Sequence, residues 1–126
     1  MIKEKSFEFA LIIIDFYKLL QSNKEFIISK QLLRSGISIG ANIEEANAGQ
    51  SKKDFLHKMS IASKEARETQ YWLKLLQKSN LIQIKDKNDL NVYNLKLGTS
   101  LSEIDQIINI LTKIVKTTSN GLNDEK

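Results

Sequence analysis

Basic side chains recur at helical spacing between positions 53 and 78, and no other group in the chain is better suited to bind a charged ligand. Residues three, four or seven positions apart lie on one side of an α-helix. At 1.5 Å per residue this row is about 37 Å long, and no acidic residue falls within it. We call it the basic stripe, and its members are Lys53, His57, Lys64, Arg67, Tyr71, Lys74 and Lys78.

The basic stripe has the chemistry needed to follow a phosphate backbone. Lysine and arginine release counterions from a nucleic acid, and Tyr71 could stack on an unpaired base, so RNA and single-stranded DNA are both suitable ligands. The alternative is a solvated helix surface, which is what most charge runs are and which is the simpler interpretation for one monomer. Repetition of the stripe around an oligomeric ring would favour binding, because weak contacts then gain avidity.

A second group of charged residues lies among apolar and small neighbours. Arg34 follows two leucines, and Glu65 shares a helix flank with Trp72. Partly buried charges need partners, so we predict an ion pair from Arg34 to Glu65 or Glu68, within one subunit or between subunits. The alternative is that these charges bind a ligand.

The residues of the chain argue against catalysis. Cysteine is absent, which excludes disulfides, thiolate catalysis, iron–sulfur clusters and zinc fingers. Di-iron bundles use two Glu-x-x-His pairs, whereas this chain has one histidine, His57, with Asp54 three residues before it. Glu65 and Glu68 have no companion cluster, and there is neither a glycine-rich phosphate loop nor a nucleophile–base pair. We therefore expect no enzymatic activity, no metal and no cofactor.

The elements that carry these residues are predicted to be helices. Proline is absent from the 126 residues and there are only five glycines, so little interrupts a helix. Apolar periodicity and polar breaks predict helices over residues 5–20, 29–48, 51–79 and 89–117. Three short connections predict an all-α, up-down-up-down antiparallel four-helix bundle as a single domain over residues 1–117. The polar tail, residues 118–126, is predicted to be disordered.

Two features of the first two helices concern packing. The first helix is apolar around most of its circumference, including the row Phe7, Leu11 and Ile14, so we expect a second copy of the protein to cover part of it. The alternative is burial deep inside its own bundle. In the second helix, Gly36 and Gly40 predict that a neighbouring backbone comes close, and Gly49 is expected to end the helix in a left-handed conformation.

Overall charge and hydropathy restrict the cellular setting. A net charge of +4 and a pI near 9.2 permit nucleic-acid binding without requiring it. The longest apolar run, residues 9–14, is far shorter than the roughly 20 residues that cross a bilayer, and the first residues do not follow a signal-peptide pattern. We expect a soluble, cytoplasmic protein.

The segments QLLRSGISIGANIEEA at 31–46 and SKKDFLHKMSIASKEARETQYWLKLL at 51–76 resemble the bacterial family of 23S rRNA intervening-sequence proteins. The resemblance implies a four-helix bundle, commonly a ring-shaped homopentamer, that is often encoded within insertions in ribosomal RNA genes and is suspected of binding nucleic acid. A related accessory protein of diversity-generating retroelements is similar, and neither relationship implies catalysis. The family motif maps here onto Arg34, Ser35, Ser38, Asn42, Glu44, Glu45, Lys64, Glu65, Glu68 and Trp72.

Two functional hypotheses follow. The first is a non-enzymatic oligomeric scaffold that binds RNA or single-stranded DNA through the basic stripe. The second is a protein-interaction adaptor with no direct nucleic-acid contact, for which the apolar first helix argues. Salt separates the two, because phosphate binding weakens steeply as salt rises and an apolar interface changes little.

Overall fold

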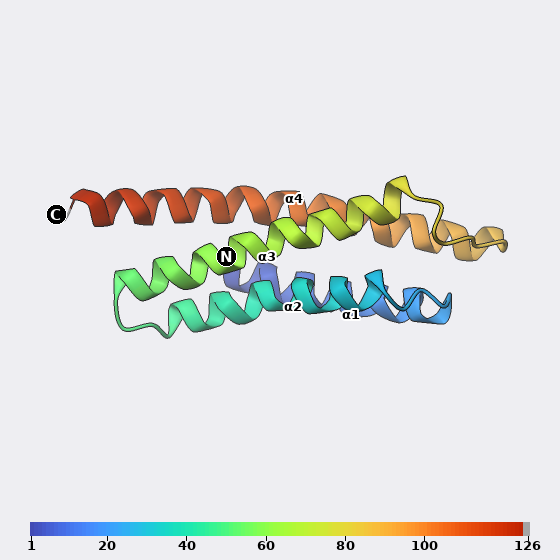
Figure 1. Cartoon of the computed structure of the whole chain (residues 1–126), viewed down its shortest axis with the longest axis horizontal. Helices are drawn as coiled ribbons and strands as arrows, with labels where there is room; N and C mark the ends of the chain where they lie inside the picture. The colour runs from blue at the N-terminus through green and yellow to red at the C-terminus, as the bar shows by residue number, and fades with distance from the viewer. Residues whose placement is uncertain (125–126) are drawn as a thin grey trace.

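Four α-helices form the computed structural model of the chain, which describes residues 1–124. The helices are α1 (Ile2–Ser22), α2 (Ile28–Asn47), α3 (Lys52–Lys78) and α4 (Lys87–Asp124), and the described residues contain no strand. Successive helices run in alternate directions (Figure 1). Contacts join α1 to α2, α2 to α3, α3 to α4 and α4 back to α1, so the chain folds as an all-α helical bundle.

The bundle core forms where one apolar side of each helix turns inward. Apolar residues spaced three or four apart produce this side, and burying each large side chain contributes about 1.5–3 kcal/mol. The largest fully buried side chains are Phe9, Ile13, Phe16, Leu20, Leu32, Ile39, Ile43, Met59, Leu73, Ile104, Ile107 and Leu111. All four helices contribute to this list, so one continuous core fixes their mutual orientation.

Helices α1 and α2 pack closely at the two glycines of α2. A Cβ atom at Gly40 would lie 3.5 Å from Ser6 Oγ and 3.6 Å from the Ser6 carbonyl oxygen, so a backbone does come close there. At Gly36 the nearest neighbour is a side chain instead, because a Cβ atom would lie 2.9 Å from Ile13 Cγ2. The predicted backbone approach therefore holds at Gly40, whereas at Gly36 the nearest atoms belong to the Ile13 side chain.

Side chains satisfy the exposed amides at the start of two helices. Ser51 Oγ accepts the N–H of Asp54 at 3.1 Å, which begins α3 where the sequence predicts it. At α2 the buried Glu25 carboxylate accepts the N–H groups of Ser29 at 2.6 Å and Ile27 at 3.3 Å. This second cap is not predicted from the sequence.

Two predicted helix endings differ from the structure. Gly49 is not in a left-handed conformation, and among the described residues a positive φ outside glycine occurs only at Lys24, where φ is 64°. The end predicted at Thr117 is also wrong, since α4 continues through Asp124. Residues 118–124 of the predicted disordered tail are thus helical, and residues 125 and 126 lie outside the described part of the chain.

The first helix leaves one apolar row uncovered by its own bundle. Phe7 is 64% exposed and Leu11 is 49% exposed, and Ile14 and the neighbouring Ile37 of α2 are also exposed. Phe7 and Ile37 line a shared groove between α1 and α2. We call Phe7, Leu11, Ile14 and Ile37 the apolar face. In the part of the chain described here, no helix combines the length and apolar content required to cross a membrane.

Candidate nucleic-acid interface

The basic stripe lies on the solvent side of α3. The opposite side of this helix turns Met59, Ala62, Ala66 and Leu73 into the core, and this rotation leaves every member of the stripe exposed. Tyr71 is 57% exposed, and its ring meets the ring of Trp72 edge-on with centroids 5.3 Å apart. The stripe therefore presents cations and one accessible aromatic surface along most of α3.

No ion pair with a carboxylate of the described residues neutralises the charge of the stripe. Some basic side chains outside the stripe have acidic partners: Lys5 Nζ lies 2.8 Å from Glu103 Oε2, and Lys58 Nζ lies 3.4 Å from Glu45 Oε2. Within residues 1–124, no side chain of the stripe forms an ion pair with a carboxylate. The stripe thus places several exposed cations without carboxylate partners in one row along α3, where a single ligand can contact them together.

Arg67 is the stripe member that reaches another helix. Its Nη2 donates a hydrogen bond of 3.1 Å to Thr112 Oγ1 on α4, and that hydroxyl donates in turn to the carbonyl of Ile108 at 2.7 Å. Further along the same helix pair, Gln70 Nε2 donates to Asp105 Oδ1. The border between α3 and α4 thus holds both a fixed arginine and a carboxylate.

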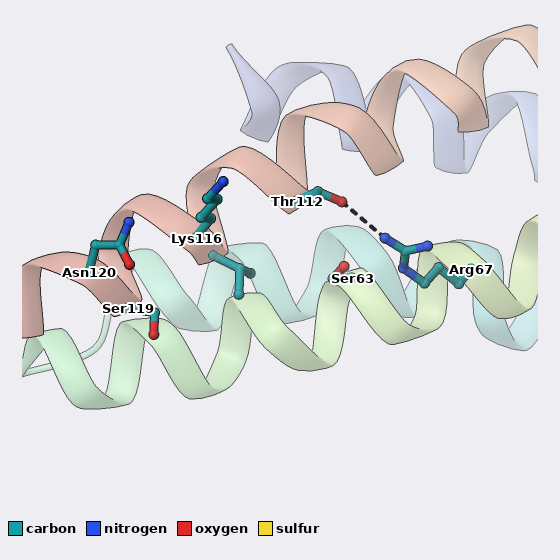
Figure 2. A pocket seen from close by; sticks show the side chains of 7 residues that line it. Ser63, Arg67, Thr112, Lys116, Ser119 and Asn120 are labelled. Atoms are coloured by element: carbon teal, nitrogen blue, oxygen red, sulfur yellow. Dashed lines mark hydrogen bonds between the residues drawn. The ribbon is translucent and has the colours of Figure 1, made fainter. Parts of the chain in front are cut away.

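A cleft of about 370 Å³ opens between α3 and α4 beside Arg67. Figure 2 shows Ser63 and Arg67 on α3 facing Thr112 and Ser119 on α4, with Arg67 pointing across to Thr112. The residues that line this α3–α4 cleft are Ser63, Arg67, Thr112, Val115, Lys116, Ser119 and Asn120. Of this set, only Arg67 is predicted from the sequence as a binding residue. The recurrence of polar residues at Thr112, Lys116, Ser119 and Asn120, at helical spacing on α4, is the signal that could have indicated the others.

The structure brings the second predicted group together on the surface between α2 and α3. Arg34 Nη1 lies 3.3 Å from Glu65 Oε2, Arg34 Nη2 pairs with Glu68, and Arg34 Nε donates to Gln31 Oε1 at 3.2 Å. Trp72 Nε1 donates to Glu68 Oε2 at 3.0 Å. The Arg34 side chain is 48% exposed, so solvent screens the cluster and its contribution to stability is modest.

The other motif residues of α2 bond mainly to nearby backbone and side chains. Ser38 Oγ donates to the carbonyl of Arg34 at 2.6 Å, and Asn42 Nδ2 donates to the carbonyl of Ser38 at 2.8 Å. Ser35, which is buried, accepts a hydrogen bond of 2.9 Å from Thr69 Oγ1 on α3. The contacts of Ser38 and Asn42 thus stay within α2, and the contact of Ser35 joins α2 to α3.

Among the residues the structure describes, no three His, Asp or Glu side chains lie close enough together to hold a metal ion.

The fold and the surface together define the class of protein: a helical bundle with a row of exposed basic residues on one helix. The chain belongs to the family of 23S rRNA-intervening sequence proteins, whose family model matches residues 1–112. The resemblance noted over residues 31–76 is thus confirmed and extends over the first helix and into the last.

A solved structure of similar fold is a protein of unknown function from the S23 ribosomal protein family of Bacteroides thetaiotaomicron VPI-5482. The two chains are 43% identical, with 92% of this chain and 99% of that chain covered and a TM-score of 0.78. No curated protein matches the chain.

Proposed function

We propose that the protein is a non-enzymatic, oligomeric scaffold that binds RNA or single-stranded DNA through the basic stripe of α3. The observation that carries this proposal is the row of exposed cations without carboxylate partners among residues 1–124. Phosphate contacts supply most of the affinity of sequence-independent nucleic-acid binding, and they need accessible, uncompensated cations. Tyr71 adds an aromatic surface on which a base can stack, worth about 1–3 kcal/mol per base.

The length of the stripe sets the expected salt dependence. Its lysine and arginine members are Lys53, Lys64, Arg67, Lys74 and Lys78. If each contacts one phosphate of a single strand, the logarithm of the binding constant falls with the logarithm of salt concentration with a slope of about −3.5 per protomer. Between 50 and 200 mM salt this slope weakens binding by about a hundredfold.

The oligomeric part of the proposal rests on the apolar face. Phe7, Leu11 and Ile14 form a continuous exposed row on α1, and Ile37 extends it across the groove onto α2. Contiguous exposed apolar surface of this kind marks an association site. We assign it to a second copy of the chain, and the family resemblance makes a ring-shaped homopentamer the expected assembly.

The same apolar face supports the second candidate function, an adaptor that binds another protein and does not contact nucleic acid. In that case the basic stripe is only the solvated surface of α3. The two functions differ in their response to salt, because an apolar interface has few charges to screen.

The deciding experiment measures binding of labelled structured RNA and single-stranded DNA by fluorescence anisotropy across a salt series. The parent is compared with a Lys64/Arg67/Lys74→Glu variant. A Lys30/Lys85/Lys87→Glu variant is the control, because these exposed lysines lie off α3 and the change in net charge is the same. Circular dichroism and light scattering establish that each protein is folded and equally assembled.

The proposal expects steep salt dependence in the parent, loss of binding in the stripe variant and weaker but persistent binding in the control. Equal losses in the two variants would mean that net charge alone attracts the ligand and that the stripe is not the interface. Absence of binding by the parent at 50 mM salt would overturn the proposal and favour the protein adaptor.

A further inference from the structure

We propose that the α3–α4 cleft is a phosphate-binding site in which Arg67 and Lys116 hold one phosphate group of the bound strand. That the phosphate belongs to a nucleic-acid strand rests on the proposed function. That the cleft binds an anion does not rest on it, because this part follows from the residues that line the cleft and can be tested with inorganic phosphate alone.

The composition of the cleft suits a hydrophilic anion. Its lining includes two cations, three hydroxyl groups, one amide and a single apolar side chain, with no carboxylate. The volume of about 370 Å³ lies within the range of about 300–1,000 Å³ found for ligand sites, which are mostly apolar. Carbon atoms make up most of the wall surface here too, but the polar groups that the lining residues carry are cations and hydrogen-bond donors, so the ligand that matches them carries negative charge and accepts hydrogen bonds.

Arg67 is positioned by a neutral partner and keeps its full charge. Thr112 Oγ1 accepts one N–H of the guanidinium at 3.1 Å, and the Thr112 proton is committed to the Ile108 carbonyl at 2.7 Å. Arginine has five N–H donors in a planar fork, so about four remain for a ligand. A guanidinium fixed in this way can bind phosphate through two parallel hydrogen bonds. Thr112 therefore orients Arg67 and does not itself donate to the phosphate.

The rest of the cleft supplies a second cation and free hydroxyl groups. Lys116 follows Thr112 by one helical turn, and its exposed side chain can turn toward the ligand on a picosecond to nanosecond timescale. Figure 2 shows Lys116 and Ser119 on α4 on the same side of Thr112 along the helix. Within residues 1–124, the hydroxyls of Ser63 and Ser119 form no hydrogen bond, so each can donate one to the phosphate.

The cleft adjoins the basic stripe at Arg67, which belongs to both. A strand that follows α3 therefore passes the mouth of the cleft, where Lys116 adds a contact from α4. Toward the start of α4 the site ends at Asp105, whose negative charge repels an anion. Asp105 lies two turns before Thr112, about 10 Å along α4, and Gln70 donates a hydrogen bond to it. The anion site thus occupies the part of the border between α3 and α4 that runs from Thr112 toward the end of α4.

The test compares Lys116→Gln with Lys113→Gln. Both residues are exposed lysines of α4, but Lys113 does not line the cleft and serves as the matched control. With a 5′-hydroxyl single-stranded RNA, Lys116→Gln should weaken binding about fivefold at 50 mM salt and make the salt slope shallower by about 0.7, the effect of one lost phosphate contact. Lys113→Gln should leave the salt slope within half of that change. Equal effects of the two substitutions would overturn the cleft as a phosphate site.

A titration with inorganic phosphate tests the cleft without nucleic acid, so it shows which of the two proposals fails. Titration should shift the NMR signals of the Arg67 side-chain N–H and the Ser63 amide in the parent and in Lys113→Gln, and much less in Lys116→Gln. If inorganic phosphate binds but RNA and DNA do not, the cleft is an anion site and its phosphate does not come from a nucleic-acid strand. Strand binding that depends on Lys64 and Lys74 but not on Lys116, with no phosphate shift, would retain the proposed function and overturn the cleft.

A comparison of oligonucleotides with and without a 5′-phosphate identifies the kind of phosphate. Equal affinities that depend equally on Lys116 support a phosphodiester within the strand, which is the expected result. A Lys116-dependent gain from the 5′-phosphate alone would reassign the cleft to a terminal phosphate monoester and overturn its assignment to the strand interior.

Discussion

Adding one methyl group at Gly36 and at Gly40 should change the stability of the bundle in opposite directions. Both glycines lie in the interior of α2, where alanine is preferred over glycine by about 1 kcal/mol. The space for the methyl group differs. At Gly40 the nearest atom, Ser6 Oγ, would be 3.5 Å away, an ordinary contact. At Gly36 two carbons of Ile13 would be 2.9 and 3.2 Å away, so Ile13 has to move.

The stiffness of Ile13 determines the size of the effect. A β-branched residue in a helix has one strongly preferred χ1 rotamer, and Ile13 is fully buried, so the crowded methyl group cannot rotate away. Overpacking of this kind costs about 1–3 kcal/mol. After the gain in helix propensity, Gly36→Ala should destabilise the fold by about 1 kcal/mol, and Gly40→Ala should stabilise it by about 1 kcal/mol. The bulkier Gly36→Leu should cost more than Gly36→Ala and force the helices apart.

The assay is urea unfolding followed by circular dichroism, at one fixed protein concentration because the proposed assembly would make the transition depend on concentration. An Ile13→Ala background supplies the internal test. That substitution alone should cost about 2–5 kcal/mol, and it removes the crowded carbons, so Gly36→Ala should then become stabilising. Equal shifts for Gly36→Ala and Gly40→Ala, or a Gly36→Leu variant that unfolds like the parent, would refute the packing argument.

Two helix caps and one buried phenol give the remaining predictions. Ser51→Ala removes the acceptor for the Asp54 N–H and should cost about 1 kcal/mol in urea unfolding, whereas Ser51→Asp should not. Glu25→Ala leaves the Ser29 N–H buried without its acceptor and should cost about 1–3 kcal/mol, and Glu25→Gln should recover part of that loss. Burial, with a smaller effect from Glu25, raises the pKa of Tyr93 above 10.0. Its stabilising effect is therefore present below pH 10 and is lost as pH rises through the folded-state pKa, so Tyr93→Phe should lose less stability than the parent between pH 9 and pH 11.

Helix interiors could be predicted from the sequence because apolar periodicity records which side of each helix is buried. The end of α4 could not be predicted from polarity, which led to a boundary at Thr117. The better signal was the continued four-residue spacing of Ile114, Thr118 and Leu122, all of which are partly buried in the structure. A weakly apolar side packed on a neighbouring helix is enough to extend a helix that already has a long hydrogen-bonded body.

The basic stripe could be found from the sequence because its members share a single helix. The α3–α4 cleft could not, because it depends on how α4 is rotated and shifted relative to α3. Spacing along α4 places Thr112 and Lys116 on one side, but only packing determines that this side meets Arg67. The cap supplied by Glu25 escaped prediction for a similar reason, since a buried carboxylate in a connection has no periodic signature.

The arrangement of the four helices makes the two proposed surfaces compatible. In the described residues α1 contacts α2 and α4 but not α3, so α1 and α3 lie on opposite corners of the bundle. The apolar face is on the outer side of α1 and the basic stripe is on the outer side of α3. A second copy seated on α1 therefore leaves the stripe of that same protomer open to solvent. In a ring, the apolar face of one copy packs on a different surface of the next copy. If that receiving surface lies away from α3, assembly brings several open stripes together, and weak phosphate contacts on each protomer add up to firm binding of one strand.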